Sequence, residues 1–273
     1  MQTDSFGAVT LAHLTDPHLF SAPDATLLGI NTYNNLQGVV QHIQQQARTA
    51  DLLLATGDLS QDGSPEAYRH FLELVEPLQL PVHVLPGNHD VRESFHAVMQ
   101  RRAAPVIELE HWRIVLLDST IPNDSAGRLD NNQLAILDEV LQTDDPRHLL
   151  IAMHHSPLSM QTAWLDTMVI ENADALLERV KRHPNVKALL WGHVHQAYDA
   201  ELPRDSGEHA PALRLMATPA TCFQFLPGSR DFSVEAIAPG YRWITLMANG
   251  SIHTEVVRVP GLQEVPDTNS EGY

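Results

Sequence analysis

The sequence has little cysteine and no long hydrophobic run. Cys222 is the only cysteine, so the chain cannot form an intrachain disulfide, and we interpret this residue as a small buried apolar side chain. No apolar stretch approaches the roughly 18 residues that a bilayer-spanning helix needs. Residues 1–7 lack the positive and apolar regions of a signal peptide. We therefore expect a cytoplasmic protein.

Positive charge is also scarce. The 34 acidic residues outnumber the 17 lysines and arginines, which gives a formal net charge of −17. A protein with this charge repels polyanions, so we expect no nucleic-acid partner and no binding to anionic membranes. A small anionic substrate is still compatible, because two bound divalent cations reverse the potential locally. The composition does not define an oligomeric state.

Hydrophobic periodicity predicts an α/β fold. Continuous apolar runs typical of buried strands alternate with helical segments, and the last third of the chain contains strands alone. The predicted strands are 9–14, 52–55, 82–85, 106–110, 113–117, 149–153, 186–191, 213–217, 241–247 and 252–259. The predicted helices are 36–50, 64–78, 131–141 and 173–182, with Ser64 as an N-cap and Pro65 at the first helical position. This order predicts an α/β sandwich with an added antiparallel sheet.

The length of 273 residues is near the upper size for one hydrophobic core, so we expect a single domain spanning 1–273. Within it, residues 10–200 form the predicted core of the site and residues 210–260 contain the C-terminal strands. We interpret the polar segment 202–211 as a surface loop, and residues 263–273 as a tail that frays.

Five apolar runs each end in a short polar cluster. The clusters are Asp16 with His18, Gly57-Asp58, Gly87-Asn88-His89-Asp90, His154-His155 and Gly192-His193-Val194-His195. Ligands in α/β sheets collect outside the carboxyl ends of strands, so all five clusters can converge on one edge. Carboxylate, amide and imidazole groups without thiolate suit Mn²⁺, Fe or Zn²⁺ better than a structural zinc. Seven or eight such ligands are enough for a two-metal site that cleaves phosphate esters.

Each cluster alone is a weak or moderate signal. A single Gly-Asp or Asp-x-His pair is usually turn chemistry, and a lone histidine at a strand end is more often a satisfied polar residue than a ligand. The five clusters in this order, each after a predicted strand, carry the interpretation. The chain has 16 histidines, and we interpret six of them as silent surface groups: His42, His70, His96, His183, His209 and His253.

These motifs resemble the complete signature of the calcineurin-like metallophosphoesterases over residues 10–200. Further motifs make the whole chain similar to the bacterial 3′,5′-cyclic AMP phosphodiesterases: LGINT at 28–32, ATGDLSQD at 55–62, ATPATC at 217–222 and SEGY at 270–273. The resemblance implies a four-layer α/β/β/α sandwich, with two mixed sheets flanked by helices and a dinuclear metal site.

Carried over by position, the resemblance implies seven metal ligands: Asp16, His18, Asp58, Asn88, His154, His193 and His195. Asp58 is the implied bridge. It joins a first ion held by Asp16, His18 and His195 to a second held by Asn88, His154 and His193. Fe²⁺ or Mn²⁺ is favoured, with Zn²⁺ as an alternative. His155 is interpreted as a supporting residue, because His154 matches the family ligand.

The implied reaction is hydrolysis of 3′,5′-cyclic AMP to 5′-AMP by in-line attack of a hydroxide that bridges two metal ions. His89 is the implied catalytic residue and donates to a phosphate oxygen or to the leaving 3′-oxygen. Five residues are expected to contact the substrate: His18, Asp58, Asn88, His89 and His195. The Asp-Arg pair of the protein phosphatases is replaced by Gln61 and Asp62, which argues against a phosphoprotein phosphatase and leaves open what orients His89.

The sequence does not identify the residues that hold the base. Phe223, Phe225 or Trp164 can provide an apolar wall, although ordinary core or loop packing is the more common role of such residues. Asn31 and Thr32 are candidates for polar contacts to the nucleotide. Two other functions are kept as alternatives to the hydrolysis of cyclic AMP. One is a phosphodiesterase of broader specificity, acting on glycerophosphodiesters or other cyclic nucleotides, and the other is a non-catalytic binding scaffold on the same fold.

Overall fold

The computed structural model describes residues 7–204, 211–262, 266–267, 270 and 272. His209 and most of the predicted tail at 263–273 lie outside these ranges. Within the described ranges, none of the helices combines the length and the hydrophobicity of a membrane span.

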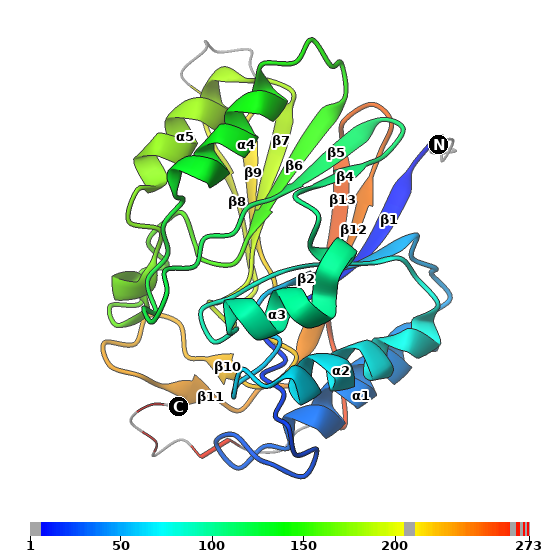
Figure 1. The fold of residues 1–273 in the computed structure, drawn as a ribbon, viewed down its shortest axis with the longest axis vertical. Helices are drawn as coiled ribbons and strands as arrows, with labels where there is room; N and C mark the ends of the chain where they lie inside the picture. The colour runs from blue at the N-terminus through cyan, green and yellow to red at the C-terminus, as the bar shows by residue number, and fades with distance from the viewer. Residues whose placement is uncertain (1–6, 205–210, 263–265, 268–269, 271, 273) are drawn as a thin grey trace.

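One sheet contains five strands in the order β13-β12-β1-β2-β3 (Figure 1). The three N-terminal strands run parallel, and the two C-terminal strands are antiparallel to their neighbours. The strands are β1 (Val9–Leu14), β2 (Leu52–Thr56), β3 (Val82–Leu85), β12 (Gly240–Leu246) and β13 (Ile252–Arg258). Three helices pack on the outer face of this sheet: α1 (Thr32–Gln44), α2 (Pro65–Val75) and α3 (Arg92–Met99).

The other sheet contains six strands in the order β4-β5-β6-β7-β9-β8, of which the four central strands are parallel. They are β4 (Val106–Glu108), β5 (Trp112–Leu116), β6 (His148–Met153), β7 (Val186–Trp191), β8 (Tyr198–Leu202) and β9 (Leu213–Ala217). Helices α4 (Asn131–Leu141) and α5 (Ala173–Arg182) cover its outer face. A small hairpin, β10 (Gln224–Phe225) with β11 (Val234–Glu235), lies apart from both sheets. The short 3₁₀ helices are η1 (Glu76–Leu78), η2 (Gln100–Ala103) and η3 (Leu165–Met168).

The two sheets face each other across an apolar layer. Leu52 and Leu54 of β2 belong to this layer, whereas Leu53 packs with the helices on the opposite face. Successive side chains of a strand alternate between its faces, so an uninterrupted apolar run buries both of them. Leu150 and Leu190 complete the layer from the second sheet. The order helix, sheet, sheet, helix confirms the four-layer α/β/β/α sandwich (Figure 1).

The prediction that the C-terminal strands form a separate antiparallel sheet is wrong. Strands β12 and β13 extend the first sheet from β1, and β9 lies inside the second sheet between β7 and β8. The pairing of β12 with β1 runs from Val9 opposite Leu246 to His13 opposite Arg242. It covers an edge of β1 that would otherwise expose unpaired backbone groups.

Some predicted element boundaries also need correction. The helix expected at 36–50 is α1 (Thr32–Gln44), which begins earlier because the Asn31 side chain caps it by accepting from the backbone N–H of Asn34 at 2.8 Å. Strand β8 ends at Leu202, the first residue of the predicted loop at 202–211, and residues 205–210 of that loop lie outside the described ranges. Helix α3 and the hairpin β10-β11 have no predicted counterpart, because elements of eight and two residues show too little periodicity. The N-cap of α2 at Ser64 is confirmed.

Candidate metal centre

The carboxyl ends of β1, β2, β3, β6 and β7 meet between the two sheets, and each predicted cluster follows one of these strands. The structure brings all seven predicted ligands together. Six of them are almost fully buried: Asp16, His18, Asp58, His154, His193 and His195. Asn88 is half-buried and lies at the wall of an open cavity. Two sheets that are distant in sequence therefore contribute to one centre.

The backbone at this centre is unusual. Five of the predicted ligands have positive φ angles, with values of 53°, 48°, 50°, 61° and 47° for Asp16, His18, Asp58, His193 and His195. A non-glycine residue in this left-handed region costs about 1–2 kcal/mol, and such strain is concentrated at functional sites. Here it occurs directly after β1, β2 and β7. The tight turns let side chains from consecutive loop positions reach the same point.

Asp58 lies in the middle of the predicted ligands. Its Oδ2 atom is 3.7 Å from Nε2 of His18 and 3.2 Å from Nε2 of His154, so it is faced by imidazoles from both sheets. Its Oδ1 atom accepts a hydrogen bond from the backbone N–H of His89 at 2.8 Å. Among the described residues no group makes a hydrogen bond of good geometry to the buried Oδ2, although Nε2 of His154 is 3.2 Å away. A buried carboxylate oxygen normally has a partner, and a metal ion bound at this position would supply one.

The remaining ligands form two groups around Asp58. In the first group, Nε2 of His195 lies 3.4 Å from Oδ1 of Asp16 and 3.3 Å from Nε2 of His18. In the second group, Nε2 of His154 lies 3.1 Å from Oδ1 of Asn88, and the rings of His154 and His193 are 5.0 Å apart. The resemblance implies two ligand sets with these members, and that division stays a prediction.

Three histidines are held so that Nε2 points into the centre. Nδ1 of His18 lies 2.6 Å from Oε1 of Gln61. Nδ1 of His154 lies 2.7 Å from the carbonyl oxygen of Thr56, and Nδ1 of His195 lies 2.9 Å from the carbonyl oxygen of Phe223. Each partner is a carbonyl oxygen that only accepts, so each Nδ1 carries the proton. This leaves the Nε2 lone pair available for a metal ion, which is the usual role of such a partner.

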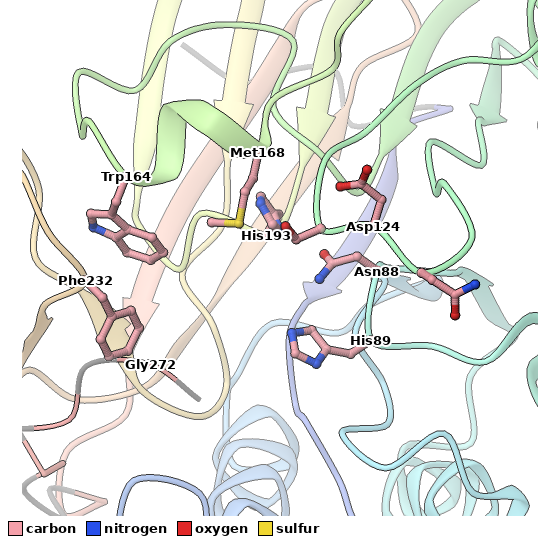
Figure 2. A pocket seen from close by; sticks show the side chains of 10 residues that line it. Asn88, His89, Asp124, Trp164, Met168, His193, Phe232 and Gly272 are labelled. Carbon is pink, nitrogen blue, oxygen red and sulfur yellow. The ribbon is translucent and has the colours of Figure 1, made fainter.

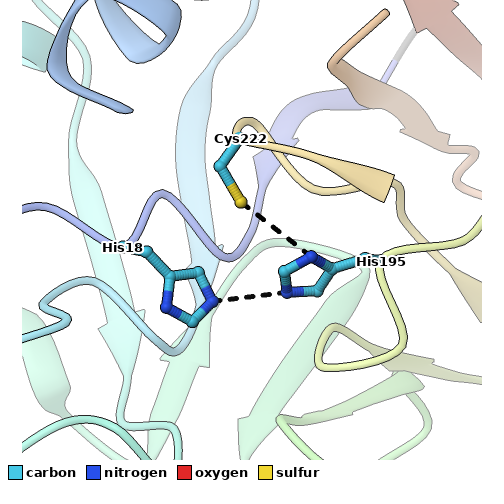
Figure 3. Close-up of side chains that lie close together, drawn as sticks. All are labelled: His18, His195 and Cys222. Atoms are coloured by element: carbon cyan, nitrogen blue, oxygen red, sulfur yellow. Dashed lines mark hydrogen bonds between the residues drawn. The ribbon is translucent and has the colours of Figure 1, made fainter. Parts of the chain in front are cut away.

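Cys222 lies outside this ligand set although it is adjacent to it. Its sulfur is 3.9 Å from Nδ1 of His195, whereas Nε2 of His195 is the atom that faces His18 (Figure 3). The Nδ1 proton already binds the carbonyl of Phe223. The thiol is 1% exposed, and burial raises its pKa well above the ordinary value. The expectation of a small buried cysteine is confirmed.

The electrostatics of the centre favour cations. Burial lowers the pKa of His18 to about 3 and that of His193 well below its ordinary value, so both imidazoles are neutral as ligation requires. Burial also lowers the pKa of His154, but the Asp58 carboxylate outweighs this effect and raises it to about 9. Burial raises the pKa of Asp58, yet the charges of His154 and His89 hold it well below the usual range. The buried carboxylate of Asp58 therefore attracts positive charge. The carboxylate, amide and imidazole groups gathered here are suitable ligands for divalent metal ions.

The loop after β3 is tied to the loop after β2. The Asp90 carboxylate accepts from the backbone N–H groups of Gly87 at 2.8 Å, Ser60 at 3.0 Å and Leu59 at 3.2 Å. A Cβ at Gly87 would collide with Asp58, so only glycine allows this close approach. The sequence pattern assigns no role to Asp90, although it belongs to the Gly-Asn-His-Asp motif. Its role is to hold the loop that presents Asn88.

His89 is positioned by two of the predicted ligands. Its backbone is anchored on Asp58, and its ring lies edge-on to the ring of His18, with centroids 4.9 Å apart and an interplanar angle of 78°. The side chain also lines the open cavity. These contacts bear on the question left by the substitution of Gln61 and Asp62, because they place His89 against Asp58 and His18.

Gln61 orients His18, a role that its motif position alone did not indicate. We expect Gln61→Leu to weaken Mn²⁺ binding about 10–100-fold, the usual loss when the partner of a ligating histidine is removed. Isothermal titration with Mn²⁺ measures this loss. Gln44→Leu is the matched control, because Gln44 donates to the carbonyl of Pro77 away from the centre. Unchanged Mn²⁺ affinity in Gln61→Leu would show that His18 is oriented without it.

His155 lies behind the second group. It is fully buried, its Nδ1 is 2.8 Å from Oγ of Ser119, and its ring is 4.9 Å from that of His154 and 4.8 Å from that of His193. Burial lowers its pKa to about 3. Its Nε2 is close enough to the other two rings to compete for an ion. The choice of His154 as the ligand and His155 as its support therefore stays a prediction.

A cavity of about 400 Å³ opens beside the centre. Its lining contains predicted site residues at one end and apolar side chains at the other (Figure 2). The lining residues are Asn88, His89, Asn123, Asp124, Ser125, Trp164, Met168, His193, Phe232 and Gly272. The sequence pattern does not single out Phe232 or the 123–125 segment, because neither lies in a motif at a predicted strand end.

Most of the residues proposed to contact the base do not line the cavity. Of the three aromatic residues, Trp164 alone lines the cavity, while Phe223 and Phe225 are 1% and 0% exposed. The ring of Phe225 stacks on His195 at 4.1 Å, so it supports a predicted ligand. The proposed polar contacts are also engaged elsewhere: Asn31 caps α1, and the Thr32 hydroxyl donates to the carbonyl of His18 at 2.9 Å.

Solved structures show that this fold is shared by phosphatases. A dimetal phosphatase from Danio rerio matches with a TM-score of 0.61 and 15% identity, over 92% of this chain and 99% of that one. A purple acid phosphatase from yellow lupin matches with a TM-score of 0.68 and 13% identity, over 95% of this chain and 53% of that one. At these identities the likeness shows the fold alone.

Sequence relatives are similar over nearly the whole chain. Identity is 38% over 268 residues to the 3′,5′-cyclic adenosine monophosphate phosphodiesterase CpdA of Pseudomonas aeruginosa, covering 97% of this chain and 96% of the relative. The protein of the same name from Escherichia coli K12 is 39% identical over 269 residues, which cover 97% of this chain and 95% of the relative. A 3′,5′-cyclic-nucleotide phosphodiesterase of a Nostoc species is 32% identical over 270 residues, which cover 97% of this chain and 98% of the relative.

The family model for calcineurin-like phosphoesterases matches residues 9–197. That range contains all five polar clusters and both sheets' contributions to the centre. With the fold, the ligand geometry and the near full-length relatives in agreement, the chain belongs to the calcineurin-like phosphoesterase family.

Proposed function

We propose that this protein is a metal-dependent phosphodiesterase that hydrolyses 3′,5′-cyclic AMP to 5′-AMP. The observation that carries the proposal is the convergence of two ligand groups on Asp58, beside a cavity that His89 lines. Family membership supports the reaction class, and the names of the relatives with 38–39% identity support the substrate.

We assign the metal ions to two sets that share Asp58. Asp16, His18 and His195 would hold the first ion, and Asn88, His154 and His193 would hold the second. Oxygen and nitrogen ligands without thiolate favour Fe²⁺ or Mn²⁺, with Zn²⁺ as an alternative. When bound, the ions lower the pKa of a water molecule and neutralise charge on the phosphate oxygens.

The residues of the chain orient the substrate and move one proton. His18, Asp58, Asn88, His89 and His195 surround the place where the phosphate binds. The oxygen of water adds to phosphorus and a proton of that water passes to solvent. The bond from phosphorus to the 3′-oxygen breaks, and the leaving oxygen takes a proton from His89 in its imidazolium form, which leaves a neutral imidazole that solvent reprotonates. The edge-on contact of His89 with His18 holds the imidazole near the phosphate position. Such general-acid assistance contributes about 10²–10⁴-fold in typical enzymes.

The proposal extends to the partner, the compartment and the domain. A small anionic diester is the partner, and the net charge of −17 opposes nucleic acid and anionic membranes. A cytoplasmic location rests on the single cysteine. Residues 1–273 act as one domain, because both sheets contribute ligands to one centre.

The direct test is turnover with metal supplied. Mn²⁺-loaded protein is expected to convert cyclic AMP to 5′-AMP, as followed by liquid chromatography, and to lose this activity in EDTA and regain it with Mn²⁺. Cyclic GMP, a glycerophosphodiester and a phosphomonoester are compared in parallel. Faster turnover of the glycerophosphodiester would favour the broad-specificity alternative. No turnover of any diester by folded, metal-loaded protein would favour the binding scaffold.

A further inference from the structure

We propose that the aromatic end of the cavity, formed by Trp164, Phe232 and Met168, is the binding site for the planar base of the nucleotide. The proposal rests on the proposed function and specifies where its substrate is recognised. The cavity has two chemically different ends (Figure 2). Asn88, His89 and His193 form the polar end at the metal centre, and the rings of Trp164 and Phe232 lie across the cavity from Asn88 and His89 (Figure 2). A nucleotide has the same division, with its charge on the phosphate and its apolar surface on the base.

Trp164 differs from the other tryptophans of the chain. Trp112, Trp191 and Trp243 are 0%, 0% and 2% exposed and belong to the packed layers. Trp164 is half-buried and presents its indole to the cavity. A partly exposed aromatic ring at a cavity wall is the arrangement that stacks on planar ligands.

The indole is held in a defined orientation. Its Nε1 donates to Oγ of Ser229 at 3.1 Å, and the backbone N–H of Ala163 donates to the carbonyl of Ser229 at 3.1 Å. Its ring meets Phe225 at 84° with centroids 4.8 Å apart, and Phe232 at 68° with centroids 5.1 Å apart. Both contacts are edge-to-face, so these two rings do not stack in parallel on the indole. A preorganised ring loses little freedom when a base binds.

The size and chemistry of the cavity match a mononucleotide. A volume of about 400 Å³ lies within the range of small-molecule sites, which are mostly apolar with a few polar groups that fix orientation. Stacking tolerates any base because every base has an aromatic face. The aromatic end therefore selects for the presence of a base, and we expect it to serve cyclic AMP and cyclic GMP alike.

Kinetics on two substrates test the site. The substrates are cyclic AMP and ribose 3′,5′-cyclic phosphate, which has the same cyclic diester and no base. Trp164→Ala is expected to raise KM for cyclic AMP about 10–100-fold, the range that loss of one stacked base gives, and to leave kcat/KM for the base-free diester unchanged. Trp164→Phe is expected to recover most of the affinity. Tyr33→Ala is the matched control, because Tyr33 is a half-buried aromatic residue that packs on His70 outside the cavity.

Fluorescence provides a readout that does not depend on turnover. Trp164 is the one partly exposed tryptophan of the four, so 5′-AMP is expected to quench the emission of the metal-loaded protein and ribose 5-phosphate is not. The quenching is expected to disappear in Trp164→Phe. This measurement on the unmodified protein is decisive even if Trp164→Ala folds poorly.

The outcomes separate this inference from the proposed function. Equal losses on both diesters in Trp164→Ala, or equal quenching by 5′-AMP and ribose 5-phosphate, would overturn the base site and leave the phosphodiesterase intact. An unmodified protein that hydrolyses neither diester would overturn the proposed function itself. A large loss with cyclic AMP alone, together with quenching specific to 5′-AMP, supports the site.

Discussion

Asp58→Asn is expected to remove stable binding of both metal ions and to lower kcat by at least about 10²–10³-fold, the loss that removal of one preorganised electrostatic group gives. Asparagine keeps the shape of the side chain and an oxygen that can accept from the backbone of His89. The variant therefore isolates the loss of charge at Oδ2, the buried atom that faces His18 and His154. Metal content by mass spectrometry and turnover of cyclic AMP measure the effect.

The control for this variant is Asp51→Asn. Asp51 precedes β2, as Asp58 follows it, and its carboxylate accepts from the backbone N–H of Thr10 away from the centre. Asp51→Asn is expected to keep both ions and normal turnover. Metal ions stabilise only a folded state that binds them, so Mn²⁺ is expected to raise the Tm of the control and not that of Asp58→Asn. Two ions retained at full occupancy in Asp58→Asn would refute the bridging role.

His89→Ala is expected to retain both metal ions and to lose about 10²–10⁴ in kcat with cyclic AMP, the usual contribution of a general acid. The imidazole lines the cavity and its ring meets that of His18 edge-on, whereas Asn88 is the proposed ligand from this loop. Steady-state kinetics and metal analysis on the same preparation separate the two effects. His96→Ala is the matched control, because His96 is an exposed histidine on the following helix.

A second substrate decides which oxygen His89 serves. A p-nitrophenyl phosphodiester has a leaving group that departs without a proton, so the loss in His89→Ala is expected to be much smaller with it than with cyclic AMP. Equal losses with both substrates would instead assign His89 to a non-leaving phosphate oxygen. Near-normal turnover of cyclic AMP, with both ions bound, would exclude His89 from catalysis.

The α/β class and the polar clusters of the centre were predictable because both depend on local patterns, whereas the four-layer arrangement was implied by the family resemblance. The run Leu52-Leu53-Leu54 identifies a strand buried on both faces, and the structure places its leucines in two different layers. Polar residues directly after such strands must lie at the sheet edge, so the meeting of Asp16 and Asp58, which follow the neighbouring parallel strands β1 and β2, follows from topology.

The surroundings of the ligands were less predictable. Gln61 is recognisable in sequence as a departure from a motif, but its contact with Nδ1 of His18 depends on how two loops approach each other. The same is true of Asp90, whose three backbone contacts join separate loops. Among the aromatic residues, composition cannot distinguish Phe225, which stacks behind His195, from Phe232, which lines the cavity.

By itself, the sequence determined the α/β class, the strands that end in polar clusters and the types of ligand available at those ends. Period-two and period-3.6 patterns are local properties, and a ligand type is the chemistry of one side chain. Tertiary structure alone decided that β12 and β13 extend the first sheet, that Asp58 Oδ2 lies between two imidazoles, and that Trp164 and Phe232 form one end of the cavity. These features depend on contacts between residues distant in the chain, which form only when the two sheets pack together.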